Sequence, residues 1–279
     1  MATTSKGFLE KAREEIYKIT GIHLADNKDS LILNRIEKLA RELKISDYDE
    51  ILKEVSLGKY RQEFINAFTT NKTDFFREPF HFTDMMDRVL PRLCREKNSI
   101  KIYCSASSTG EEPYSIAATL LHAKEVYRCD GVPASIIATD IDTNVLDFAQ
   151  KGQYKVDTLL NKLPTWLELD RYFEMKPLEG EKSREIQMNA KACLKSLISF
   201  KTMNLFSEKY PFARNEFDVI FCRNVLIYFK VEDQKKVLER LFSHLKVGGT
   251  LYLGHSENIL TLQGRVDRLG QNIFVKNRD

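Results

Sequence analysis

The chain has 279 residues and a mass of 32.4 kDa, and 43% of its residues are hydrophobic while 30% are charged. This composition supports a sizeable core and excludes a chain that is disordered by composition. A formal net charge of +3 argues against a dedicated nucleic-acid binder, because such domains carry a strong basic excess. No stretch approaches the roughly 18 apolar residues of a membrane span, and residues 1–6 lack the apolar core of a secretory signal. We therefore expect a cytoplasmic protein without direct membrane insertion.

The first part of the chain has the apolar spacing of amphipathic helices. Apolar side chains recur every three or four positions over residues 8–19, which predicts one helix with a single buried face. A second helix is predicted over residues 30–44, and shorter ones over residues 48–55 and 61–68. No strand-like alternation occurs here, so residues 1–70 are expected to form a small all-helical domain.

From residue 99 onward, short apolar strands alternate with helices. Strands are predicted over residues 99–104, 134–139, 217–222 and 250–253, and helices over residues 113–125, 143–151 and 232–245. This alternation is typical of a parallel sheet with helices on both faces, and residues 265–276 look like a closing pair of strands. Residues 99–279 are expected to form an α/β domain, joined to the helical domain by a linker and connecting helix over residues 71–98.

The stretch between Tyr172 and Phe206 departs from this alternation. It is polar and rich in turn residues, and it becomes strand-like at residues 197–200. We interpret it as an insertion at about residues 173–203 that forms a small antiparallel sheet. A long surface excursion is the alternative interpretation.

The cysteines and histidines show no pattern of a disulfide scaffold or a metal site. The five cysteines are odd in number, no CxxC occurs, and Cys104 and Cys222 lie in apolar strand-like runs. Buried, reduced thiols are therefore expected, and a disulfide framework is not. The five histidines lack metal-ligand spacing, so no metal site is predicted.

A run of small residues follows the first predicted strand, and two glutamates, Glu111 and Glu112, follow the run. Small residues let the backbone approach a ligand at the carboxyl edge of the sheet, where open α/β sheets bind ligands. The glutamates also suit a helix N-terminus, so a simple helix start is the alternative. GxGxxG is absent, and two carboxylates would repel a pyrophosphate. An acidic mouth favours a ligand with cationic groups and no phosphate, such as S-adenosyl-L-methionine.

Polar side chains also follow the next strands. Asp140 ends the second predicted strand, where a carboxylate can accept the hydroxyls of a ribose, while Asp142 is predicted to cap the following helix. Arg223 and Asn224 follow the third. The DPPY-like run with which amine-directed nucleic-acid methylases hold a flipped base is missing, which argues against a base as substrate.

Two further segments allow two interpretations. Polar and aromatic residues alternate over residues 69–82 and include Arg77, so this junction either completes a site or is an ordinary linker. Tyr228 lies shortly after the third strand and belongs either to the site or to the core.

Five motifs in order carry a family resemblance: NKTDFFR (71–77), STGEEPYS (108–115), ATDID (138–142), FCRNVLIYF (221–229) and GHSEN (254–258). With them the chain resembles the chemotaxis receptor methyltransferases, the CheR family of protein-glutamate O-methyltransferases, over nearly its whole length. The resemblance implies an all-helical N-terminal domain for receptor recognition, followed by a Rossmann-like class I methyltransferase domain of α/β class with a small inserted antiparallel β-subdomain.

The resemblance also implies the site. Arg77 and Tyr228 would lie nearest the reacting centre as catalytic residues. The cofactor S-adenosyl-L-methionine, or its product S-adenosyl-L-homocysteine, would contact Asn71, Thr73, Arg77, Ala106, Glu112, Asp140, Asn204, Leu205, Arg223 and Asn224. Whether Arg77 orients the carboxylate of the substrate or of the cofactor stays open.

The implied reaction is methyl transfer to a glutamate oxygen. A glutamate with a pKa of about 4.3 is ionised near neutrality and needs no general base, so the protein would align the groups and exclude water. Tyr228 would border the sulfonium. Two alternatives keep the cofactor: an enzyme with RNA or a small molecule as acceptor, and a non-enzymatic sensor or scaffold.

The implied partners are the cytoplasmic domains of methyl-accepting chemotaxis receptors. The second predicted helix carries a basic strip of Arg35, Lys38 and Arg41, continued by Lys44, which would bind acidic methylation helices. The alternative is a solvated face with intrahelical pairs. A receptor C-terminal peptide could add a strand to the β-subdomain, but residues 183–200 show no clear signature for it.

Overall fold

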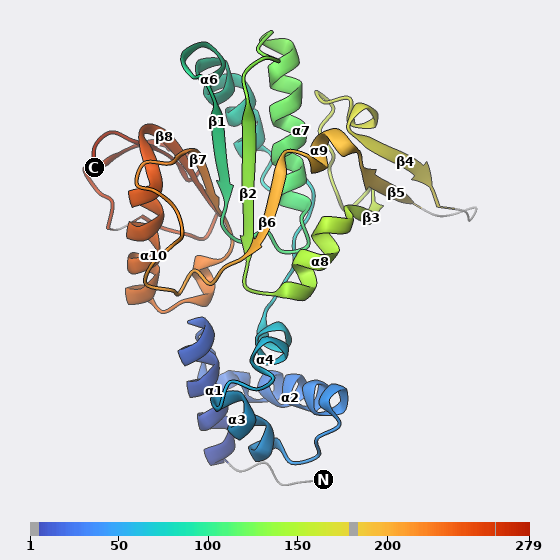
Figure 1. The fold of residues 1–279 in the computed structure, drawn as a ribbon, viewed down its shortest axis with the longest axis vertical. Coiled ribbons are helices and arrows are strands. Elements are labelled where there is room, and N and C mark those ends of the chain that lie inside the picture. The colour runs from blue at the N-terminus through green and yellow to red at the C-terminus, as the bar shows by residue number, and fades with distance from the viewer. Residues whose placement is uncertain (1–5, 179–183, 260) are drawn as a thin grey trace.

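The helical domain lies below the α/β domain in the computed structural model, which describes residues 6–178, 184–259 and 261–279 (Figure 1). It contains α1 (Lys6–Thr20), the 3-10 turn η1 (Asp26–Lys28), α2 (Asp29–Leu43), α3 (Tyr48–Ser56) and α4 (Arg61–Phe68). The predicted apolar stripes of α1 and α2 are buried in one shared core, so the helical character of this region is confirmed. The chain then passes into the sheet through three short helical segments. These are α5 (Phe80–Asp84), the π-helical turn η2 (Met85–Val89) and α6 (Leu90–Glu96).

The α/β domain is built on a mixed sheet whose described strands have the order β6-β2-β1-β7-β8-β10-β9. Their bounds are β1 (Ile100–Cys104), β2 (Ala134–Asp140), β6 (Ile198–Thr202), β7 (Phe217–Cys222), β8 (Leu245–Leu253), β9 (Val266–Gly270) and β10 (Ile273–Lys276). The strands from β6 to β8 are parallel, whereas β10 and β9 are antiparallel to their neighbours. The chain order reverses beside β1, which is where open α/β sheets form a ligand crevice.

Helices cover both faces of this sheet, as predicted. They are α7 (Glu111–Val126), α8 (Thr143–Lys151), α9 (Ala192–Lys195) and α10 (Val231–His244), with the 3-10 turns η3 (Leu169–Arg171) and η4 (Leu226–Tyr228) between them. Successive residues of β1 point to opposite faces, so Ile102 packs in the cluster that includes α7 while Tyr103 packs in the cluster that includes α10. β8 starts directly after α10 at Leu245 and contains Gly248 and Gly249, so it begins earlier than the strand predicted over residues 250–253.

The inserted antiparallel sheet exists, but its predicted position needs correction. It consists of β3 (Gln153–Asp157), β4 (Phe173–Pro177) and β5 (Glu185–Ala190) in the order β3-β5-β4. The strand-like residues 197–200 do not belong to it, because β6 pairs in parallel with β2 at the edge of the main sheet. An edge strand exposes much of its length, which makes its sequence look like part of a surface insertion. Residues 179–183 of the turn-rich stretch lie outside the described residues.

The expectation of free thiols is wrong for two cysteines. Cys94 at the end of α6 is bonded to Cys129 after α7, with their Cα atoms 5.6 Å apart. The packing of α6 against α7 brings together two residues that lie 35 positions apart in the sequence. Cys104 and Cys222 are free and buried, as predicted, and Cys193 is free and exposed.

The described residues, 6–178, 184–259 and 261–279, include no candidate for a membrane span or a metal site. Within these residues no helix has both the length and the apolar character that a membrane crossing requires. No group of three or more His, Cys, Asp or Glu side chains among them is arranged to hold a metal ion.

His81 on α5 is a buried titratable group that joins this helix to the sheet. Its side chain is 0% exposed, its Nε2 lies 2.8 Å from the carbonyl oxygen of Gln271, and its ring packs against Tyr252. Burial lowers the pKa of His81 from 6.5 to about 4, and the positive charge of Arg223 acts in the same direction. The folded protein therefore holds this imidazole neutral where an unfolded chain would already be protonated.

We predict that His81 makes folding less stable as the pH falls from about 6.5 to about 4. In that window the unfolded state binds a proton that the folded state does not, so the contribution grows to about 3 kcal/mol at pH 4. Glu111 has the opposite effect on the free energy of unfolding. Burial raises its pKa to about 7, so the folded state takes up this proton before the unfolded state does and is stabilised as the pH falls. The test therefore compares two proteins by urea unfolding. As the pH falls from about 6.5 to about 4, His81→Phe should lose less free energy of unfolding than wild type. Parallel pH curves for the two proteins would contradict the prediction, and His255→Phe on the surface serves as the control.

Candidate functional site

A pocket of about 410 Å³ lies between the two domains. The arrows of β1 and β2 point toward the helical domain in Figure 1, so the carboxyl ends of the parallel strands face that domain. The volume lies in the range of small-molecule sites. The pocket is thus at the edge of the sheet where the sequence predicted a ligand.

The pocket brings together the residues that the sequence singled out. The segments after β1, β2, β6 and β7 and the linker after α4 all contribute to its lining. Among the lining residues are Asn71, Thr73, Arg77, Ala106, Glu112, Asp140, Asn204, Leu205, Arg223, Asn224 and Tyr228. Every residue predicted to contact the cofactor, and both predicted catalytic residues, therefore lie around one space.

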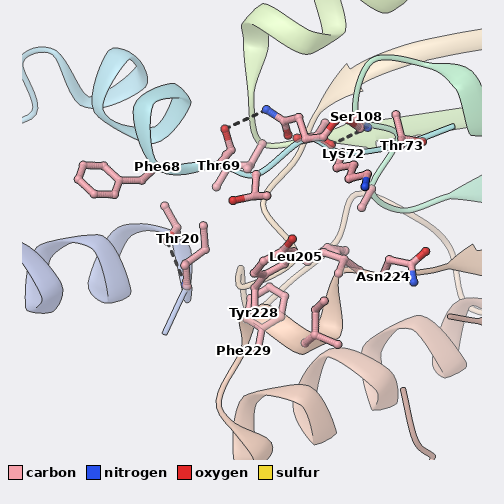
Figure 2. Close-up of a pocket in the computed structure, with 18 of the residues that line it drawn as sticks. Thr20, Phe68, Thr69, Lys72, Thr73, Ser108, Leu205, Asn224, Tyr228 and Phe229 are labelled. Carbon is pink, nitrogen blue, oxygen red and sulfur yellow. Dashed lines mark hydrogen bonds between the residues drawn. The ribbon is translucent and has the colours of Figure 1, made fainter. Parts of the chain in front are cut away.

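The helical domain forms the other side of this pocket, which the sequence did not predict. Figure 2 shows Thr20 and Phe68 of that domain across the space from Asn224, with Leu205 and Tyr228 between them. The turn after α1, including His23, and Arg35 of α2 also line it. The sequence after α1, with Gly21 and then Asp26 and Asn27, is typical of a turn and gives no indication of a ligand.

The turn after α1 is fastened to the α/β domain beside the pocket. The N–H of His23 donates to the carbonyl of Tyr228 at 2.8 Å, and Ile22 forms an antiparallel bridge with Phe229. On α1, Tyr17 donates to Asp233 at 2.6 Å. These contacts hold Tyr228 between the helical domain and the end of β7.

Asp140 presents a buried carboxylate at the end of β2. It accepts hydrogen bonds from the backbone N–H groups of Ser108 at 2.8 Å and Asp142 at 3.0 Å. Burial raises the pKa of Asp140. Each oxygen keeps a further lone pair for a hydroxyl donor. Asp142 caps α8 through the N–H groups of Asn144 and Val145, as predicted.

Two asparagines that were predicted to contact the cofactor form side-chain hydrogen bonds within the protein. The amide of Asn204 donates to the carbonyl of Ile19 at 2.8 Å, which ties α1 to the segment after β6. The amide of Asn71 donates to Asp142 at 2.9 Å, which ties the linker to the N-terminus of α8. Both residues line the pocket and also fix its walls.

Arg223 lies at the centre of a buried charge network. Its guanidinium is 0% exposed and lies 2.6 Å from Glu112 and 3.3 Å from Glu78, and it donates to the carbonyl of Arg77. Burial raises the pKa of Glu112, and Arg223 partly opposes that rise. Burial alone would also raise the pKa of Glu78, but Arg223, the His255 N–H and the Asn224 amide together hold it below its usual value.

Sequence reasoning did not assign a role to Glu78 or to Glu257. Glu257 is buried and accepts from the N–H groups of Val225 at 2.8 Å and Leu226 at 2.7 Å, so it holds the loop between Arg223 and Tyr228. A Cβ at Gly254 would lie 2.6 Å from the side-chain nitrogen of Asn224, which explains why glycine precedes this glutamate. The motif GHSEN was the signal, but its sequence alone did not show which loop it supports.

The expectation of an acidic pocket mouth is wrong. Glu111 does not line the pocket and instead accepts a hydrogen bond from Thr109 at 2.6 Å. Consecutive helical residues point about 100° apart, so only Glu112 faces inward, where Arg223 neutralises it. The charged residues among the described lining are Lys28, Arg35, Lys72, Arg77 and Arg223 against Glu112 and Asp140. The pocket is therefore cationic.

The basic strip of α2 is divided by the fold. Arg35 turns toward the pocket, where it donates to the carbonyl of Thr69 at 2.8 Å, and burial lowers its pKa. Lys38 is exposed and lies 3.8 Å from Glu42, and exposed Arg41 donates to a carbonyl within its own helix. The role of Arg35, Lys38 and Arg41 in substrate binding stays a prediction.

Comparisons with known proteins agree along the whole chain. Residues 8–69 match the family described as CheR methyltransferase, all-alpha domain, and residues 71–275 match CheR methyltransferase, SAM binding domain. The chain is 36% identical to chemotaxis protein methyltransferase 2 of Pseudomonas aeruginosa, over 95% of this chain and 91% of that protein. It is 35% identical to the chemotaxis protein methyltransferase of Escherichia coli, over 99% and 92% of the two chains. A solved S-adenosylmethionine-dependent methyltransferase from Mesorhizobium loti aligns at 11% identity over 62% of this chain and 54% of that chain, with a TM-score of 0.30.

We predict that Arg223→Met lowers the free energy of unfolding by about 3 kcal/mol or more, because it leaves Glu112 buried beside a second carboxylate without a cation. The loss should shrink as the pH is lowered and Glu112 takes up a proton. Urea unfolding at two pH values measures both effects. Lys101→Met, which breaks the half-exposed pair with Glu216, should cost less than about 1 kcal/mol. Equal losses in the two variants would contradict a special role for Arg223.

Proposed function

Because this chain belongs to the CheR methyltransferase family, we propose that it transfers methyl groups from S-adenosyl-L-methionine to glutamate side chains of methyl-accepting chemotaxis receptors. The coarser assignment, a chemotaxis methyltransferase that uses this cofactor, follows from the family and its relatives. The finer proposal is that the acceptor is a glutamate and the product a methyl ester. It implies that the chain works in the cytoplasm, on the cytoplasmic domains of the receptors.

The observation that carries the finer proposal is the cationic lining of the pocket. Among the described lining residues, Lys28, Arg35, Lys72 and Arg77 are not neutralised by Glu112, which pairs with Arg223. A cleft with an excess of one charge concentrates ligands of the opposite charge. An ionised carboxylate is favoured by this lining, whereas a cationic or neutral acceptor is not.

The residues of the pocket fit the cofactor. We infer that Asp140 would accept the ribose hydroxyls, and Asn204 and Leu205 line the same pocket. Glu112, in addition to its ion pair with Arg223, would face the cationic end of the cofactor, and Arg77 would face a carboxylate. When bound, S-adenosyl-L-methionine supplies a methyl group on a positively charged sulfur, and S-adenosyl-L-homocysteine is left after transfer.

The chain's own residues have the task of alignment. The acceptor is already ionised near neutrality, since a glutamate has a pKa of about 4.3, so no proton has to be removed from it. Arg77 would orient a carboxylate, and Tyr228, held by the helical domain, would border the reacting groups. Fixed orientation of this kind supplies several kcal/mol of the rate enhancement. The helical domain would exclude water by covering the carboxyl ends of the strands.

We also propose two surfaces for the receptor. The exposed residues Lys38 and Arg41 of α2 face away from the helical core and would contact acidic methylation helices. A receptor C-terminal peptide could extend the small sheet, because β3 and β4 are its edge strands in the described order and an edge strand accepts an added strand through main-chain hydrogen bonds.

Calorimetric titration with S-adenosyl-L-homocysteine tests the cofactor site first. We expect micromolar or tighter binding to the wild-type chain. Asp140→Ala should weaken that binding at least tenfold, because it removes the proposed acceptor of the ribose hydroxyls. The matched control is Asp218→Ala on β7, whose carboxylate pairs with Lys246 outside the pocket. An unchanged affinity in Asp140→Ala would contradict the assignment of Asp140.

Base-labile methyl transfer to purified receptor fragments tests the acceptor. We expect wild-type chain to form esters, and Arg77→Ala to lose at least a hundredfold in rate because the carboxylate that Arg77 is proposed to orient loses its cationic partner. Replacing the target glutamates of the fragment by glutamine should abolish labelling. A methylated product that resists base would overturn the glutamate assignment while leaving the cofactor site intact.

Charge reversal tests the receptor surface on α2. Lys38→Glu combined with Arg41→Glu should raise KM for receptor fragments at least tenfold at low salt and leave S-adenosyl-L-homocysteine binding unchanged, because neither residue lines the pocket. The control reversal is Lys235→Glu on α10, an exposed lysine of the other domain. If both proteins methylate like wild type, the strip on α2 is only a solvated face.

A further inference from the structure

Glu78 connects three segments that meet at the inner end of the pocket. Its Oε1 accepts from the side-chain amide of Asn224 at 3.3 Å and from the N–H of His255 at 3.3 Å. Its Oε2 lies 3.3 Å from the Arg223 guanidinium. The linker, the end of β7 and the loop after β8 are therefore joined by one carboxylate, which is only 14% exposed.

Charge neutralisation alone does not explain this carboxylate. Arg223 already has a closer partner in Glu112, at 2.6 Å against 3.3 Å. A second carboxylate leaves the group with a net negative charge, which costs free energy in a buried site. Besides Arg223, the Glu78 carboxylate contacts Asn224, the His255 N–H and the buried ring of His81, whose Nδ1 lies 3.7 Å from Oε2. The contacts to Asn224 and His255 reach two other segments of the chain, so they locate the linker rather than balance a charge.

The backbone around Glu78 is held in an unusual conformation. Phe76 and Glu78 both have positive φ, at 52° and 55°, and non-glycine residues of this kind persist where the surroundings hold them. They flank Arg77. The N–H of Phe76 donates to Ser115 Oγ at 3.0 Å, and the carbonyl of Arg77 accepts from Arg223, so the backbone of Arg77 is clamped on both sides. Its guanidinium, which donates to the carbonyl of Lys72 at 3.1 Å, is left at the pocket.

We propose that Glu78 is a positioning residue, whose carboxylate clamps the linker against Asn224 and thereby sets where the Arg77 guanidinium enters the pocket. This inference rests on the proposed function, because it assigns Glu78 a part in the methyl transfer. Glu78 does not contact the reacting groups in this account. Its effect on the rate passes through Arg77.

A double-mutant cycle in the full chain separates this role from a general structural one. The variants are Glu78→Gln, Arg77→Lys and the two combined, and the readouts are kcat and KM for a receptor fragment at saturating cofactor. We expect Glu78→Gln to lower kcat about tenfold with little change in KM. The combined variant should be no more than about twofold slower than Arg77→Lys alone. If Glu78 acts only by positioning the Arg77 guanidinium, its removal has little further effect once that guanidinium is absent.

Glu78→Asp supplies the second comparison, because it keeps the negative charge and draws the carboxylate back by one methylene. A positioning role predicts that kcat stays low in Glu78→Asp, whereas full recovery would mean that charge alone matters and would overturn the proposal. This variant also tests the role if Glu78→Gln fails to fold. Glu216→Gln, which loses a partly buried ion pair outside the pocket, is the matched control and should keep wild-type kcat.

The outcomes distinguish the two proposals. Rate losses that multiply in the combined variant would show that Glu78 acts independently of Arg77 and would overturn the positioning role alone. Wild-type kcat in Glu78→Gln would do the same. A wild-type chain that binds S-adenosyl-L-homocysteine but does not methylate receptor fragments would overturn the proposed function and the role of Glu78 together.

Discussion

The site depends on the ion pairs and the hydrogen bond that the buried guanidinium of Arg223 forms. A cation without solvent is tolerated only where carboxylates and hydrogen-bond acceptors surround it, and Glu112, Glu78 and the carbonyl of Arg77 do so here. These partners come from α7 and from the linker, while Arg223 itself directly follows β7. One buried charge therefore fixes the relative positions of three segments, and it does so at the inner wall of the pocket.

The second constraint is that the pocket has walls from two domains. The turn after α1 is bonded to the loop after β7 through His23 and Ile22, and Asn204 reaches back to the end of α1. The domain proposed to recognise the receptor is thus in direct contact with Tyr228. Any shift of that domain would change the surroundings of Tyr228. Under the proposed function, receptor recognition and methyl transfer would be linked through these few contacts, without a long-range pathway.

The charge of the pocket lining differs from what the composition of the whole chain suggests. The whole chain carries a formal net charge of only +3, yet the described lining of the pocket has more cations than carboxylates. Part of this excess arises because Glu111 and Glu112, adjacent in the sequence, turn to different sides of the helix. Part arises because α2 rotates Arg35 inward while Lys38 and Arg41 stay at the surface. Helical geometry, rather than residue count, decides which charges a ligand meets.

Local sequence determined the long helices, most strands, the cap of α8 at Asp142 and the pocket residues that lie in the linker and after the strands, because periodicity and short motifs act over neighbouring positions. It did not determine the pocket wall that the helical domain supplies. Long-range packing decided the rest. The pairing of β6 with β2 decided that residues 197–200 leave the insertion, and the contact of α6 with α7 decided that Cys94 meets Cys129. The same holds for Glu78: nothing near it in the sequence indicates that it meets Asn224 and Arg223. Those contacts form only when the linker, β7 and β8 converge, since their chemistry depends on distance in space and not on separation along the chain.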